Sequence, residues 1–111
     1  MSTLRICGIG AAALAGFLIC ARAIEAQEPM IQRGRAFAQA NCARCHAIGR
    51  SGESPLPKAP PFRTLHKRYP VDDLEEALAE GIRTGHPAMP EFVLDKHQIR
   101  DLISYLKSLE P

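Results

Sequence analysis

The sequence predicts a small all-α domain, and three observations lead to this fold class. Two segments, at about 72–82 and 95–109, place apolar side chains at the three- and four-residue spacing of a helix. Each begins with an aspartate followed three positions later by Glu or Gln, a pattern that caps helix N-termini. No segment shows the strict apolar–polar alternation of a strand. The 111 residues allow one domain, whose core would be weak by itself because only 5% of the residues are aromatic.

Residues 1–26 are expected to be an export signal that precedes a domain over 27–111. Arg5 supplies the positive start, an apolar run follows over 6–21, and small residues offer cleavage after Ala23 or Ala26. The apolar run is shorter than the about 20 residues that a membrane-spanning helix needs. The sequence therefore predicts a periplasmic protein, with an uncleaved membrane anchor as the alternative.

The first helix of the domain is expected from about Ile31 into the segment 42–46, after a short polar segment that contains Pro29. Residues 32–40 are rich in Ala, Gln and Arg, which form helices readily. Gly34 and Ala38 lie four residues apart, so one face of this helix is small enough for close packing.

The segment 42–46 has the sequence Cys-Ala-Arg-Cys-His, which is the attachment pattern of a covalently bound haem. Cys42 and Cys45 on one helical turn can bond both vinyl groups along one porphyrin edge, and His46 follows where an imidazole can bind the iron. The alternatives are a zinc half-site or a redox dithiol. The rest of the domain has no second cysteine pair, and the motif follows a helix rather than a buried strand.

The segment 49–61 is dense in glycine and proline and is expected to be a loop without regular structure. A loop stiffened by proline can hold one carbonyl oxygen in place. The second ring nitrogen of His46 needs such an acceptor, and the candidates are the carbonyls of Pro60 and Pro61. Residues 62–69 could form a short helix with Phe62 and Leu65 inward. Its basic residues are expected to be a solvated face.

Two longer helices complete the domain. The first begins at Asp72, with Glu75 completing its cap, and ends at Gly81. The second begins at Asp95, with Gln98 in the equivalent place. Its buried stripe is expected to consist of Ile99, Leu102, Ile103, Leu106 and Leu109, with Tyr105 adjoining.

A haem iron held by one histidine needs a sixth ligand, and the loop 83–94 offers Met89. This methionine stands between Pro87 and Pro90, where no apolar helix face explains it as core packing. A thioether suits reduced iron and raises the reduction potential. His86 in the same loop is the rival, whereas the two histidines at 66 and 97 are expected in helices, facing solvent.

From about Ile31 to Leu109 the chain resembles a class I cytochrome c. The resemblance rests on the segments 42–46, 59–62 (Ala-Pro-Pro-Phe), 85–90 (Gly-His-Pro-Ala-Met-Pro) and 101–106 (Asp-Leu-Ile-Ser-Tyr-Leu). It implies three main helices, a short helix and loops around one haem c, with Gly34 meeting Leu102 and Tyr105 where the first and last helices cross.

The resemblance also assigns roles at the iron. It implies that His46 and Met89 are the axial ligands and that the carbonyl of Pro60 orients His46. Two features depart from the family. Ala38 stands where an aromatic residue is common, with Phe37 one position earlier. The short separation of His46 and Met89 is typical of small bacterial members, whose haem edge is more exposed.

These observations favour an exported, monomeric monohaem electron carrier that docks transiently with redox protein partners and is not an enzyme. The net charge of +2 is too small to indicate nucleic acid. The basic residues Arg44, Arg63, Lys67 and Arg68 could steer an acidic partner. One alternative is a permanently bound or membrane-anchored subunit of a dehydrogenase or oxidase. Another is a haem enzyme such as a peroxidase, which requires Met89 to leave the iron.

Overall fold

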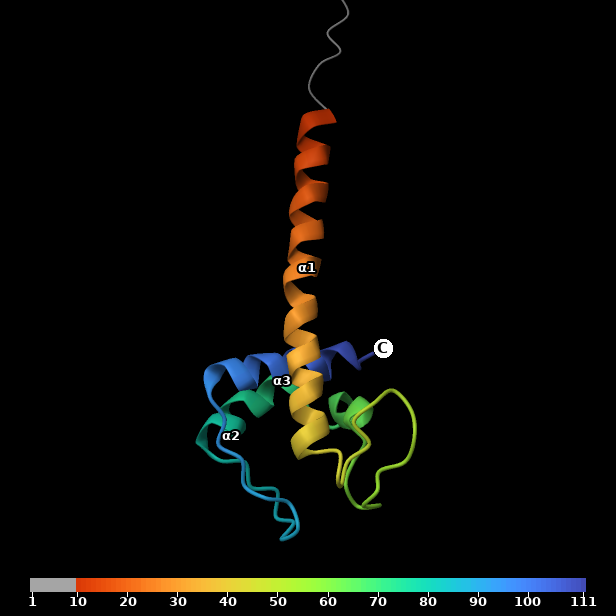
Figure 1. Ribbon diagram of the computed structural model, residues 1–111, viewed down its shortest axis with the longest axis vertical. Coiled ribbons are helices and arrows are strands. Elements are labelled where there is room, and N and C mark those ends of the chain that lie inside the picture. Colours follow the sequence, from red (N-terminus) through yellow and green to blue (C-terminus); the bar gives the residue numbers. More distant parts are fainter. Residues whose placement is uncertain (1–9) are drawn as a thin grey trace, which may run out of the picture.

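The helices and their connections define the fold of the chain, shown in Figure 1 as a computed structural model. The structure describes the backbone over residues 10–111 and the side chains from residue 25 onward. The elements are α1 (Gly10–Asn41), the 3₁₀ helices η1 (Phe62–Lys67) and η2 (Val71–Asp73), α2 (Leu74–Glu80) and α3 (Lys96–Ser108). Residues 10–111 contain no strand, which confirms the all-α prediction.

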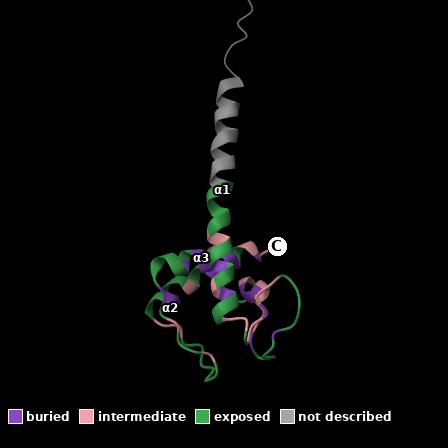
Figure 2. Cartoon of the chain, viewed as in Figure 1, coloured by how far each residue is buried: buried purple, intermediate pink, exposed green. Residues whose placement is uncertain are grey.

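Helix α1 begins well before Ile31, so the expected start of the first helix was wrong. It runs from Gly10 to Asn41 with Pro29 inside it, because the residues upstream of Pro29 are also good helix formers. Its first half projects away from the other elements, and residues 25–29 are exposed (Figures 1 and 2). The leader signals at Arg5 and Ala23 lie outside the described side chains. In the described part of the chain, no helix combines the length and apolar character needed to cross a membrane.

The C-terminal part of α1 packs tightly against α3, and Gly34 is the point of closest approach. A Cβ atom at Gly34 would lie 2.0 Å from the carbonyl oxygen of Asp101 and 2.8 Å from Cβ of Tyr105. Ala38 has no exposed surface, and Phe37 beside it is half-buried. The expected crossing at Gly34 and Tyr105 is therefore confirmed. The small side chain of Ala38 lets the two helices meet closely at this position.

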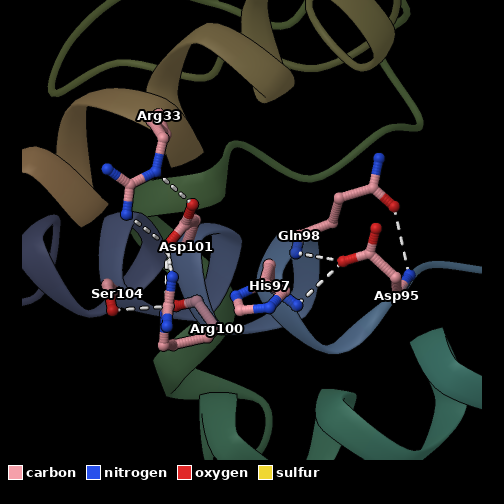
Figure 3. Close-up of polar contacts among 7 residues, drawn as sticks. All are labelled: Arg33, Asp95, His97, Gln98, Arg100, Asp101 and Ser104. Carbon is pink, nitrogen blue, oxygen red and sulfur yellow. Dashed lines mark hydrogen bonds and ion pairs between the residues drawn. The ribbon is translucent and has the colours of Figure 1, made fainter.

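Asp101 of α3 joins the two helices through hydrogen-bonded ion pairs, and its pairing with Arg33 was not predicted from the sequence. Its buried carboxylate accepts hydrogen bonds from Nε and Nη2 of Arg33 at 2.6 and 3.2 Å (Figure 3). Arg100 adds bonds from Nε and Nη2 at 3.2 and 3.1 Å. The bond from Arg33, with a smaller contribution from Arg100, lowers the pKa of the Asp101 carboxyl below its ordinary value.

Replacing Asp101 with asparagine should lower the free energy of unfolding by about 1–2 kcal/mol at neutral pH, because the bonds from Arg33 lose their charge assistance. Since the pKa of Asp101 is lower in the folded state, its contribution is complete above the unfolded-state pKa of about 4. The contribution fades as the pH falls through the folded-state value. Denaturant unfolding of the holoprotein should therefore show the two proteins converging at acid pH. Asp73→Asn, at a residue that makes no side-chain cap bond, is the control. A difference that persists at acid pH would contradict this account.

The two expected helix caps have different outcomes. Oδ1 of Asp95 accepts from the backbone amides of His97 and Gln98 at 2.8 and 2.9 Å, and Oε1 of Gln98 accepts from the amide of Asp95 at 3.1 Å (Figure 3). This capping box is confirmed. The one expected at Asp72 is wrong, because the chain enters α2 through η2 and Asp72 lies inside that 3₁₀ turn. Its carboxylate instead binds Nζ of Lys107 on α3 at 2.6 Å.

The core lies between α3 and the segments packed on it. All the residues expected in the apolar stripe of α3 are buried: Ile99, Leu102, Ile103, Leu106, Leu109 and Tyr105. Phe62 and Leu65 of η1 join them, as predicted. Arg63 and His66, expected on a solvated face, are instead half-buried. The reason is that η1 lies against the C-terminal end of the chain rather than free in solvent.

Candidate functional site

The cysteine motif forms a tight turn that continues directly from α1. The amide of Cys42 donates to the carbonyl of Ala38 at 2.8 Å, and the amides of Cys45 and His46 donate to the carbonyl of Cys42 at 3.1 and 2.9 Å. Both cysteines are free and half-buried. Burial raises the pKa of the Cys42 thiol to about 11, so this thiol is uncharged at neutral pH before it reacts.

His46 is oriented by the loop that follows it. Its Nδ1 lies 2.8 Å from the carbonyl oxygen of Pro60. The carbonyl of Pro61 instead accepts from the hydroxyl and amide of Thr64 at 2.7 and 3.0 Å. Because a carbonyl oxygen can only accept, Nδ1 of His46 is the protonated nitrogen and Nε2 keeps a lone pair for a metal. The ring of Phe62 packs on the imidazole, with centroids 5.0 Å apart and planes at 44°.

Three hydrogen bonds join the segment 49–62 to Cys45 at the end of the motif and to Ala47 just after it. The amide of Leu56 donates to the carbonyl of Cys45 at 3.1 Å, and the amide of Phe62 donates to the carbonyl of Ala47 at 2.9 Å. The third bond runs from the amide of Ala47 to Oγ of Ser54, at 3.0 Å between two buried residues. Sequence reasoning missed Ser54, since nothing distinguishes it from the other serine of this loop.

Replacing Ser54 with alanine should lower the free energy of unfolding by about 1–3 kcal/mol, because the buried amide of Ala47 would lose its acceptor. Chemical denaturation of the holoprotein measures this change. Ser51→Ala, in the same loop but at an exposed residue, should have little effect. Equal stability of the two variants would contradict a structural role for the Ser54 hydroxyl.

Met89 lies in a loop that is closed at its base. The amide of Ile82 donates to the carbonyl of Phe92 at 3.2 Å, and the amide of Leu94 donates to the carbonyl of Leu78 at 2.8 Å. Within the loop, the amide of Met89 donates to the carbonyl of His86 at 3.0 Å. Met89 is half-buried and His86 is exposed. In Figure 1 this loop and the end of α1 lie toward the same end of the molecule.

Glycine is required at one end of this loop. Gly81 ends α2 with a φ of 114°, a conformation that other residues rarely adopt. A Cβ atom there would also lie 2.3 Å from Oε1 of Glu91. Glu91 in turn accepts from Nε of Arg83 at 3.0 Å. Gly81 therefore lets the chain leave α2, and the bond from the amide of Ile82 to the carbonyl of Phe92 holds the two ends of the loop together.

These residues fit a covalently bound haem. The two free thiols have the required spacing, and His46 presents an unprotonated nitrogen. Half-buried apolar side chains suitable for covering a porphyrin pack against the core, among them Ile48, Leu74, Ile82 and Phe92. Across the described residues, no three His, Cys, Asp or Glu side chains converge as a metal site.

Comparison with known proteins also points to a haem-binding protein. The family model of cytochrome c matches residues 31–110. Cytochrome c-552 of Bradyrhizobium diazoefficiens is 31% identical over 78 residues, which cover 70% of this chain and 73% of the relative. A cytochrome c-553-like protein of Synechocystis sp. is 34% identical over 77 residues, which cover 69% of this chain and 67% of the relative. No solved structure matches the chain.

Proposed function

Because the chain belongs to the cytochrome c family, we propose that it is an exported monohaem electron carrier whose iron is held by His46 and Met89. As a small class I c-type cytochrome it is an electron-carrying haem protein and not an enzyme. Its haem c is bound covalently through Cys42 and Cys45, and supplies a centre that takes up and releases one electron at a time. The protein's part is to hold, orient and shield this group.

The orientation of His46 is the observation that carries the proposal. The carbonyl of Pro60 accepts from Nδ1 at 2.8 Å, which leaves Nε2 as the only nitrogen able to bind iron. Phe62 fixes the ring from one side, at a centroid distance of 5.0 Å. An imidazole held in this way would move little between the two oxidation states, which is what a fast electron carrier requires.

Met89 is the second ligand that the loop supports best. It is half-buried between two prolines, whereas His86 is exposed. The closed base of the loop, with its two backbone bonds, limits how far the thioether could move away. A methionine ligand favours reduced iron and therefore a high reduction potential.

Absorption spectra of the purified protein, recorded oxidised and reduced, together with acid and organic extraction, test the proposed ligands and the covalent attachment. The expected result is one low-spin haem with histidine and methionine ligands, which stays with the protein during acid and organic extraction. A haem that extracts would overturn covalent attachment. A high-spin spectrum would show that Met89 does not bind the iron, and it would favour the alternative that the protein is a peroxidase.

Export is supported by the position of Pro29. Inside a helix, proline removes one backbone hydrogen bond, but in the first turn the missing N–H has no partner to lose. Cleavage after Ala26 would place Pro29 in the first turn of the remaining helix. The mass of the periplasmic holoprotein should therefore correspond to residues 27–111 plus one haem. A full-length mass in the membrane fraction would instead support the anchored subunit.

We expect a redox protein to dock transiently on the surface near the Met89 loop. Val93 has 67% of its surface exposed, the largest exposure among the big apolar side chains of the described residues. A small apolar contact of this kind suits the weak, short-lived interfaces of electron carriers. The partner is accordingly proposed to be another redox protein, bound by a monomer.

A further inference from the structure

We propose that a basic pocket between η1 and the C-terminal end of the chain binds a phosphate-type oxyanion. The pocket has a volume of about 340 Å³, and its basic lining residues are Arg50, Arg63, His66 and Lys67. Leu109 contributes an apolar wall. None of these residues belongs to the proposed haem site, so this inference is independent of the proposed function.

The geometry of η1 explains why these side chains gather. In a 3₁₀ helix, residues three apart lie directly above one another. Phe62 and Leu65 therefore share one edge, which is buried in the core. Arg63 and His66 share the next edge, and both line the pocket. The same short helix thus packs one edge on the haem side and presents a basic edge to the pocket.

Two of the residues that line the pocket, Arg63 and His66, each contain a nitrogen atom without a partner. Nη1 of Arg63 and Nδ1 of His66 are buried, and neither makes a hydrogen bond within the protein. Buried polar atoms without a partner are rare in folded proteins and need an explanation. A bound oxyanion would supply acceptors to the arginine, and to the histidine when its Nδ1 carries a proton.

The cationic side chains at the pocket also make no ion pair within the described part of the chain. Among the described residues, the ion pairs are Arg33–Asp101, Arg83–Glu91, Arg100–Asp101 and Lys107–Asp72. Arg50, Arg63 and Lys67 take part in none of them. Arg50 is nevertheless held in place, because its Nη2 donates to the carbonyl of Ser108 at the end of α3. Clustered cations that make no ion pair favour the binding of an anion.

A phosphate group is the chemistry that this pocket would recognise. The planar guanidinium fork of arginine matches two oxygens of a phosphate, and lysine adds a point charge. The volume exceeds that of a lone phosphate, so the bound group could carry a substituent along the wall formed by Leu109. Free phosphate and the headgroup of an anionic lipid share this chemistry.

Titration of the reduced holoprotein with inorganic phosphate tests the proposal by nuclear magnetic resonance. The expected result is saturable shifts of the amides in η1 and at the C-terminal end, which chloride at the same ionic strength does not produce. Arg63→Gln should weaken phosphate binding about tenfold, as expected for the loss of a charge-assisted contact. Arg68→Gln removes the same charge from an exposed residue next to η1 that does not line the pocket, so binding should be nearly unchanged.

Two results would overturn the proposal: phosphate shifts that do not saturate, or equal weakening by Arg63→Gln and Arg68→Gln. If Arg63→Gln does not fold, Arg50→Gln is judged by the same criterion. Vesicles of phosphatidylglycerol and of phosphatidylcholine then separate the sources of the anion. Binding to phosphatidylglycerol alone that Arg63→Gln abolishes assigns a lipid headgroup. Phosphate binding without a response to either vesicle assigns a free anion. Both of these outcomes support the site.

Discussion

Replacement of Gly34 by alanine is expected to destabilise the protein more than any other single-methyl change. The new Cβ would lie 2.0 Å from the carbonyl oxygen of Asp101 and 2.8 Å from Cβ of Tyr105. Contacts this short force α1 and α3 apart, and the oxygen belongs to a helix backbone that cannot rotate away. The expected loss in the free energy of unfolding is about 3 kcal/mol or more, a large part of the 5–15 kcal/mol that is typical of a domain.

Denaturant unfolding of the holoprotein, followed by circular dichroism, measures this effect. Gly49→Ala is the matched control, because a Cβ there meets no atom within 4 Å and the backbone of Gly49 does not have a positive φ. Its unfolding midpoint should stay close to that of the wild type. Unchanged stability of Gly34→Ala would mean that the two helices do not cross at this glycine.

Replacement of Met89 by alanine should lower the reduction potential and open the iron to added ligands. A thioether ligand stabilises the reduced state, and axial ligands set haem potentials over a range of about 0.8 V, so the proposed ligation predicts a measurable change. A drop on the order of 0.1 V or more is therefore expected. Potentiometric titration measures the potential, and binding of added imidazole or cyanide reports the open position.

Two matched variants separate the possible ligands. Met30→Ala removes a methionine from α1, before the cysteine motif, and should leave the potential unchanged. His86→Ala removes the other candidate for the sixth iron ligand in the same loop. If the potential responds to His86→Ala and not to Met89→Ala, the methionine ligand is refuted and the histidine takes its place.

Local sequence signals predicted those parts of the fold that depend on local interactions. The stripe of α3 and the capping box of Asp95 and Gln98 were predicted because periodicity and a cap require only neighbouring residues. The capping pattern at Asp72 had the same form and failed, because a 3₁₀ turn precedes α2 and a lysine from α3 takes the carboxylate. A short pattern cannot reveal a competing partner that lies 35 residues away in the chain.

Local sequence patterns are limited in the same way for the residues around the proposed haem site. The segment 42–46 and the loop at Met89 could be identified, since their chemistry is carried by residue type and spacing. The role of Ser54 depends on how the loop 49–61 folds back to the amide of Ala47. Asp101 belongs to the segment 101–106 that carries the family resemblance, but its burial and its bond to Arg33 depend on how α1 packs on α3. Neither contact has a signature in sequence, because each is made between segments that only the tertiary fold brings together.

The crossing of α1 and α3 also bears on the order in which the protein is assembled. The bond between Arg33 and Asp101 joins residues that are 68 positions apart. During synthesis from the N-terminus, Arg33 of α1 therefore has no partner until Asp101 has emerged. Contacts of such long range form late and slowly. We expect Cys42 and Cys45, immediately after α1, to remain accessible during this interval, which gives the attachment machinery time to join the haem before the fold closes.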